Sequence, residues 1–267
     1  YLIKYYEIYN FFLKILKKNK YINFIKLKNN NDTFINNKNY NLIINSESNS
    51  KISKKYFSKK IEKNYKSSAY TFIIFHRKLK NDIAKQIFTK EGPLAFLPLS
   101  NNQTSIVFSY KGSNKIELKE MKNKLKKFNN KYKIIRFGKI ENFNLKFSML
   151  RSYCHENILS FGDLIHKIHP LAGQGFNMTI RDIKILLEII QNKIDLGLPI
   201  NSSVNQEFQK NTKHRNFIFS NGIDFIYEFF KLESKLSSNI LSKSIQLLGK
   251  NKIAKNFFTK SADNGII

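Results

Sequence analysis

The residue types best suited to chemistry stand together in one stretch, residues 162–182, in the order G-D-x5-H-P-x-A-G-Q-G-x-N-x3-R-D. An ionised Asp163 offers only hydrogen-bond acceptors, which suits a ligand rich in hydroxyl groups. Gly173, Gln174 and Gly175 precede an amphipathic run, where the first amides of a helix lack partners and the helix dipole is positive. Such a helix start stabilises negative charge, so this stretch predicts a site for a charged, planar cofactor.

Taken singly, these residues have ordinary explanations. A Gly-Asp pair is a common turn, and a loop of proline and glycine often precedes a helix. His166 and His169 are spaced for a metal, but Pro170 follows at once and no third ligand is apparent, so no metal site is predicted. The specific signal is the ordered set of residues, for which chance is a poor explanation.

Hydrophobic periodicity predicts the elements that hold this stretch. The run 157–161 predicts a strand that leads into the Gly-Asp turn, and 41–44 predicts a second strand. Helices are expected over 1–18, 208–232 and 236–248. A further helix that ends near residue 192 is predicted between the turn and the first of these later helices, because apolar residues recur there at spacings of four and three, namely Phe176, Ile180, Ile183, Leu187 and Ile190.

A second region is rich in strand signals separated by turns. It predicts strands at 69–77, 87–89, 94–99, 104–110, 133–137 and 144–149, with a charged helix at 116–128. Pro98 lies inside one of these strands, and a proline there belongs at an edge or a bulge. The region therefore predicts a mainly antiparallel sheet.

The chain is strongly basic, with 47 lysines and arginines against 19 acidic residues and a formal net charge of +28. Such a charge suits a nucleic acid or an anionic membrane surface. The positive charge is spread over every segment, so a lysine- and asparagine-rich coding bias on an ordinary fold is the alternative. Nothing in the sequence matches a nucleic-acid-binding module, and a nucleic-acid partner is not expected.

The single cysteine, Cys154, excludes a disulfide within the chain and any site built from several cysteines. No run approaches the roughly 18 apolar residues of a membrane span, and no signal-peptide pattern is present. We expect a protein of the cytoplasm, free or peripheral on the inner membrane.

The ordered set closely resembles the second flavin-contact motif of the FAD-dependent aromatic hydroxylases. The nearest branch is the ubiquinone-biosynthesis hydroxylases, whose pattern is roughly GDAAHxxHPxAGQGxNxGxRD. A second phrase, TKEGPLAFLPLS at 89–100, resembles the family segment that borders the substrate chamber. The resemblance implies a mixed α/β fold: a partial FAD-binding, Rossmann-like domain with an inserted, mainly antiparallel substrate sheet and C-terminal helices.

The resemblance also implies an organisation in four segments. Residues 1–55 would be part of the FAD-binding domain, and 56–155 the substrate-binding sheet domain. Residues 156–195 would return to the FAD-binding domain, and 196–267 would form a helical region.

The same resemblance assigns functional residues by position. Pro170 matches the proline whose backbone carbonyl lies beside the reacting ring, and is the expected catalytic position. The expected FAD contacts are Gly162, Asp163, Gly173, Gln174, Gly175, Phe176 and Asn177. The expected substrate contacts are Leu94, Phe96 and Pro98. The implied activity is hydroxylation of the ring of a polyprenyl phenol in ubiquinone biosynthesis, with NAD(P)H and O2 as co-substrates, at a membrane surface or in a biosynthetic complex.

Two departures from the family pattern leave alternatives open. No G-x-G-x-x-G follows any predicted strand, although that fingerprint seats the FAD pyrophosphate in the family. Ser46-Glu47 stands where the family has Asp-Gly. A remnant of the family without cofactor therefore stays an alternative, as does, in a different class, a basic nucleic-acid-binding protein.

Overall fold

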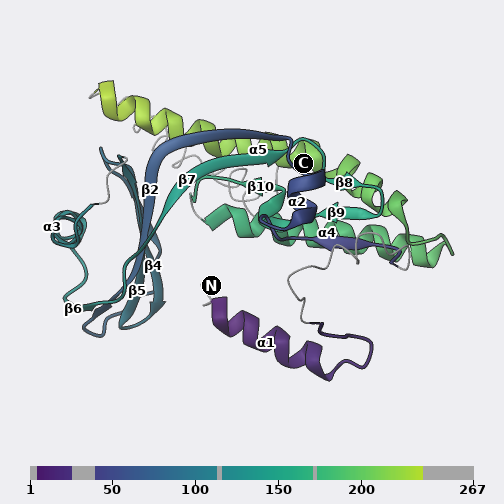
Figure 1. The fold of residues 1–267 in the computed structure, drawn as a ribbon. Coiled ribbons are helices and arrows are strands. Elements are labelled where there is room, and N and C mark those ends of the chain that lie inside the picture. Colours follow the sequence, from purple (N-terminus) through teal and green to yellow (C-terminus); the bar gives the residue numbers. More distant parts are fainter. Residues whose placement is uncertain (1–4, 26–39, 113–115, 171–172, 237–267) are drawn as a thin grey trace, which may run out of the picture. The chain divides into compact units, whose positions relative to one another are not determined.

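The computed structural model describes residues 5–25, 40–112, 116–170 and 173–236. The chain forms two compact units, called here the sheet unit (residues 1–31 and 66–144) and the motif unit (residues 32–65 and 145–267). Strands β2 (Lys60–His76) and β7 (Glu141–Leu150) each begin in one unit and end in the other (Figure 1). The four-segment division expected from the sequence stays a prediction.

The sheet unit is built on antiparallel pairs in the order β2-β5-β4-β3. Strand β2 pairs with β5 (Gln103–Lys111), β5 pairs with β4 (Pro93–Ser100), and β4 pairs with β3 (Lys85–Phe88). Strand β6 (Ile134–Phe137) pairs with the far end of β2. Every strand expected here forms, so the prediction of a mainly antiparallel sheet is confirmed.

One face of this sheet carries the core of the unit. Tyr70, Phe72 and Ile74 alternate along β2 and are all buried, as expected for a strand with one face toward a core. Helix α3 (Leu118–Phe128) contributes Met121 and Leu125 to the same cluster. Helix α1 (Tyr5–Lys18), which was also expected, buries no side chain among its described residues.

Pro98 lies at a β-bulge, a position that a residue without a backbone N–H can occupy. Strand β4 changes register with β5 between Pro98 and Ser100, which marks a bulge. Strand β3 pairs with β4 only up to Phe96, so no backbone donor is needed at Pro98 on that side. The expectation of an edge or bulge position is confirmed.

The motif unit contains a second, smaller sheet in the order β1-β9-β8. Strand β1 (Ile43–Asn45) runs parallel to β9 (Ile158–Ser160), and β8 (Cys154–His155) is antiparallel to β9. Short helix α2 (Lys51–Tyr56) follows β1, with Ser50 as its N-cap. A parallel pair joined through a long excursion of the chain is what an inserted sheet produces.

Two long helices, α4 (Gln174–Asp195) and α5 (Ser202–Leu236), complete the motif unit (Figure 1). Both were expected, and the helix predicted at 236–248 lies outside the described residues apart from its first residue. The core around them contains Tyr153, Leu159, Ile165, Leu186, Val204 and Phe208. No helix in the described part of the chain combines the length and apolar character needed to cross a membrane.

Helix α4 buries a different side from the apolar row seen in the sequence. Phe176, Ile180, Ile183 and Leu187 are all exposed, whereas Met178, Asp182, Leu186 and Ile189 are buried. The helix carries two apolar stripes, and α5 packs on the second. Periodicity identified the helix but not its buried side.

Candidate cofactor site

The Gly-Asp turn lies at the carboxyl end of a fully buried strand. All three residues of β9 are buried, and the Phe161 amide then donates to the Asn45 carbonyl of β1 at 2.9 Å. A short 3-10 turn, Gly162–Leu164, follows and leaves Asp163 exposed. The buried strand and the turn that follows it thus place the Asp163 carboxylate at the accessible edge of the sheet.

Ser46 and Glu47 lie at this same edge. Strands β1 and β9 are parallel and Asn45 pairs with Ser160, so the segments that follow the two strands leave the sheet at the same edge. The Glu47 amide donates to the Asn45 side chain at 3.3 Å, and the Glu47 carbonyl accepts from the Ser50 hydroxyl at 3.0 Å. The departure from the family pattern therefore belongs to the candidate site itself.

The loop after the turn is fixed by a buried polar network. His166, on β10 (His166–Lys167), has its Nε2 3.1 Å from Oδ2 of Asp182 on α4. The Asn216 amide of α5 donates to both oxygens of that carboxylate, at 3.1 and 3.2 Å. All three residues are buried, so one carboxylate ties the loop to both long helices.

His169 is enclosed by aromatic rings. Its ring stacks on Tyr227 at 4.1 Å and meets Tyr65 edge-on at 5.3 Å. Burial lowers the pKa of His169 to about 4, against the opposing pull of Asp224. Neither of its ring nitrogens has a hydrogen-bond partner within the described residues. The imidazole is therefore neutral at neutral pH, and its ring contacts with Tyr65 and Tyr227 hold the residue that precedes Pro170.

The start of α4 is open. Gly173 occupies the left-handed region at φ 66°, and a Cβ built on it would meet no atom of the described residues within 4 Å. Gln174 has a buried side-chain oxygen for which the described residues supply no hydrogen-bond donor. Phe176 and Asn177 are exposed in the first turn of the helix. The first backbone amides of a helix have no partner within the helix. Here they lie beside the uncrowded Gly173 and the Gln174 oxygen, for which the described residues supply no donor.

These features fit the ring and ribityl end of a flavin. The exposed Asp163 and Asn177 offer acceptor and donor groups, and the start of a 22-residue helix favours anionic character on the ring. The unpartnered Gln174 oxygen suits a ring N–H donor. The structure brings these residues, with Gly162, Gly175 and half-buried Pro170, into one segment of the motif unit.

The expected substrate contacts lie in the sheet unit instead. Leu94 and Phe96 are buried in its core, and Pro98 is half-buried at the bulge. Phe96 also lines a cavity of about 230 Å³ together with Phe128 and Tyr132. Their assignment to the substrate stays a prediction.

Sequence reasoning missed the residues that support the loop. Asn216 stands far from Asp182 in the chain, and no local pattern connects them. Tyr65 and Tyr227 likewise come from separate elements, β2 and α5. The H-x-x-H spacing was a usable signal for these two positions. His166 forms a hydrogen bond and His169 packs between aromatic rings. The described residues contain no group of three or more side chains able to hold a metal ion.

Comparison with known proteins gives the family to which this chain is similar. A family profile described as "FAD binding domain" matches residues 64–195. The mitochondrial ubiquinone biosynthesis monooxygenase COQ6 of Schizosaccharomyces pombe is 27% identical over 125 residues, covering 46% of this chain and 26% of that protein. The 3-demethoxyubiquinol 3-hydroxylase of Escherichia coli is 32% identical over 156 residues, covering 56% of this chain and 40% of that protein. The chain thus spans well under half the length of either relative.

The fold has a counterpart among solved structures. The p-nitrophenol 4-monooxygenase PnpA of Pseudomonas putida DLL-E4 superposes with a TM-score of 0.65 at 13% identity, covering 85% of this chain and 60% of that one. This likeness confirms the mixed α/β fold. The profile and the curated relatives confirm the resemblance drawn from the two motifs and FAD as the cofactor of the family. Residues 64–195 of the chain thus match an FAD-binding domain, and the chain is similar to a ubiquinone biosynthesis monooxygenase and to a 3-demethoxyubiquinol 3-hydroxylase.

Proposed function

We propose that this chain provides the flavin-ring side of the active site of a monooxygenase that hydroxylates the ring of a polyprenyl phenol in ubiquinone biosynthesis. One observation carries the proposal. The Gly-Asp turn and the open start of α4 lie in one segment, and an exposed carboxylate and an exposed amide flank a free helix N-terminus.

Each residue has a separate role in this proposal. Asp163 accepts hydrogen bonds from the ribityl hydroxyls, and the amides at the start of α4 stabilise negative charge on the ring. Gly173 leaves room for close approach of the ring. Pro170, which follows the ring-packed His169, presents its carbonyl to the reacting face. FAD, when bound, supplies the activation of O2 with electrons from NAD(P)H.

The substrate assignment rests on the relatives and on the second motif. The Schizosaccharomyces pombe relative is named as a ubiquinone biosynthesis monooxygenase and the Escherichia coli relative as a 3-demethoxyubiquinol 3-hydroxylase. The segment at 89–100 resembles the family phrase beside the substrate chamber. Leu94, Phe96 and Pro98 would provide an apolar wall for a phenol ring and the start of its tail. A polyprenyl tail resides in a lipid bilayer, which favours a place on the inner membrane surface.

Binding of riboflavin tests the proposal directly. Riboflavin has the ring and ribityl chain but no adenosine diphosphate, so its binding depends on the residues assigned here. We expect saturable quenching of riboflavin fluorescence by the chain, weakened about tenfold in Asp163→Ala because a hydrogen-bonded charged acceptor is lost.

Asp195→Ala is the matched control, because it removes an exposed carboxylate from the opposite end of α4. Its affinity should equal that of the unaltered chain. No binding of riboflavin or FAD would contradict the proposal and favour the cofactor-free remnant. Equal binding by both variants would remove Asp163 from the site.

A further inference from the structure

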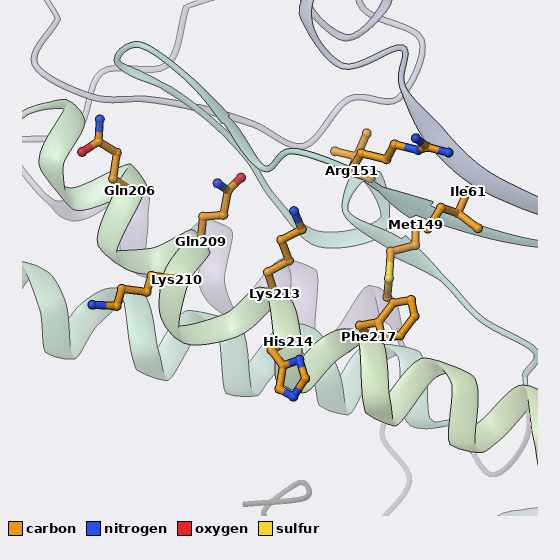
Figure 2. Close-up of a pocket in the computed structure, with 10 residues that line it drawn as sticks. Ile61, Met149, Arg151, Gln206, Gln209, Lys210, Lys213, His214 and Phe217 are labelled. Atoms are coloured by element: carbon orange, nitrogen blue, oxygen red, sulfur yellow. The ribbon is translucent and has the colours of Figure 1, made fainter.

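A second cavity, lined by residues outside the 162–177 segment, lies in the motif unit between the end of β7 and the first half of α5. Its volume is about 600 Å³, within the usual range for sites that hold small molecules. Four basic side chains line it, namely Arg151, Lys210, Lys213 and His214. Figure 2 shows Gln209 and Lys213 rising from α5 on the side of Arg151.

The basic side chains of this cavity are not neutralised by the described part of the chain. No acidic residue lines the cavity, and none of the four has an ion-pair partner among the described residues. Three acids of α5 are engaged elsewhere: Glu207 pairs with Lys193 at 3.4 Å, and Asp224 and Glu228 pair with Lys63 at 2.9 and 3.0 Å. The cavity therefore favours an anion.

The positions of the basic groups are fixed by the fold. On α5, Gln206, Lys210, Lys213 and Phe217 follow one another at spacings of four, three and four and so share one helix face. The Gln209 side-chain oxygen accepts hydrogen bonds from the Tyr153 amide at 2.6 Å and the Ser152 hydroxyl at 3.1 Å. These bonds hold α5 against the segment that follows Arg151.

The rest of the lining is apolar. Met149 and Leu150 are buried in the wall that β7 provides, and Phe217, 45% exposed, closes the cavity on the α5 side. Ile61 of β2 adds a further aliphatic surface. Basic groups beside an apolar wall suit a ligand with an anionic head and an apolar body.

We propose that this cavity binds the phosphate group of an amphiphilic phosphate ester, with Arg151 and Lys213 as the principal contacts and Phe217 against the apolar part. Arginine forms paired, charge-assisted hydrogen bonds with phosphate oxygens, and lysine adds a compact positive charge. The ligand is either a soluble phosphate ester or the headgroup of a membrane phospholipid. This proposal is independent of the flavin site.

Binding to three probes tests the proposal on the full chain. Calorimetry measures the binding of hexyl phosphate and of inorganic pyrophosphate. Co-sedimentation measures binding to vesicles of phosphatidylglycerol mixed with phosphatidylcholine, and vesicles of phosphatidylcholine alone are the uncharged reference. We expect 1:1 binding of hexyl phosphate, or binding to the anionic vesicles, that is weakened about tenfold or more in Arg151→Gln/Lys213→Gln. Phe217→Ser should weaken the binding of hexyl phosphate more than the binding of pyrophosphate, because only hexyl phosphate has an apolar part.

The matched control is Lys54→Gln/Lys184→Gln, which removes the same charge from two exposed lysines of the motif unit outside the cavity. A loss specific to the cavity variant with hexyl phosphate assigns a soluble ester, and a loss seen with vesicles alone assigns a lipid headgroup. Equal losses in the cavity and control variants would show attraction by net charge only and overturn the proposal. Failure of the unaltered chain to bind any probe would overturn it as well.

Discussion

The Nε2 atom of His166 and the Oδ2 atom of Asp182 lie 3.1 Å apart, and both side chains are almost fully buried. Arg181, the neighbour of Asp182 in the motif, has a different role: its guanidinium lies 4.4 Å from the ring centre of Phe219, and burial lowers its pKa. Asp182 thus connects α4 to β10 and α5 by hydrogen bonds, and Arg181 adds a ring contact with α5.

Asp182→Ala tests the importance of this network. The substitution leaves the donors of Asn216 and His166 buried without their acceptor, so we expect a loss of about 3 kcal/mol in the free energy of unfolding. Urea denaturation followed by circular dichroism measures the loss. Asp195→Ala removes an exposed carboxylate from the same helix and should change the stability by less than about 0.5 kcal/mol. Equal effects of the two substitutions would contradict the structural role of Asp182.

The buried position of His169 predicts a pH-dependent stability. Its pKa is about 4 in the folded chain and about 6.5 when unfolded, so between these values the unfolded state binds more protons. The free energy of unfolding should therefore fall as the pH falls from about 6.5 to 4, by up to about 3 kcal/mol from this residue. At higher pH the contribution is fully present.

His169→Phe checks this assignment, because a phenyl ring can stack between Tyr65 and Tyr227 and does not titrate. Urea midpoints at pH 5 and pH 7 should differ less for His169→Phe than for the unaltered chain. His155→Phe is the control, since His155 is exposed and stacks on Tyr56 alone among the described rings. An unchanged pH difference in His169→Phe would show that other groups cause it.

Alanine substitutions at Gly173 and Gly197 separate the stability cost of a strained backbone from an effect on flavin binding. Both occupy the left-handed region, at φ 66° and 65°, and a Cβ on either would meet nothing within 4 Å. Alanine at each position should cost about 1 kcal/mol of stability. Only Gly173→Ala should also weaken riboflavin binding, because its methyl group lies at the open helix start. Equal flavin affinity in both variants would show that the ring does not approach Gly173.

Gly92, in the second family motif, has no room for a side chain. A Cβ there would lie 2.0 Å from the Ser109 carbonyl oxygen at φ 142°, whereas one on Gly112, at φ 139°, would come no closer than 3.7 Å to Tyr110. Both alanine variants have the backbone penalty, but only Gly92→Ala forces β4 and β5 apart. We expect its thermal unfolding to reveal an additional loss of about 1–3 kcal/mol. Equal melting temperatures would contradict the clash.

Several features of this protein were determined by its local sequence. The antiparallel strands β2, β4 and β5, the bulge at Pro98 and helix α4 follow from periodicity and from the chemistry of proline, which act over a few residues. The ordered motif from Gly162 to Asp182 identified the family without any contact information, because its residue types and spacing are specific as a set.

Tertiary structure alone decided the rest. The parallel pairing of β1 with β9 brings Glu47 to the edge where Asp163 emerges, although the two residues are far apart in the chain. Packing against α5 selected which of two apolar stripes on α4 is buried. The contacts of Asp182 with Asn216, and the cavity beside Arg151, also join distant segments. Such contacts depend on free-energy differences between whole packings, and no local pattern of residue types encodes them.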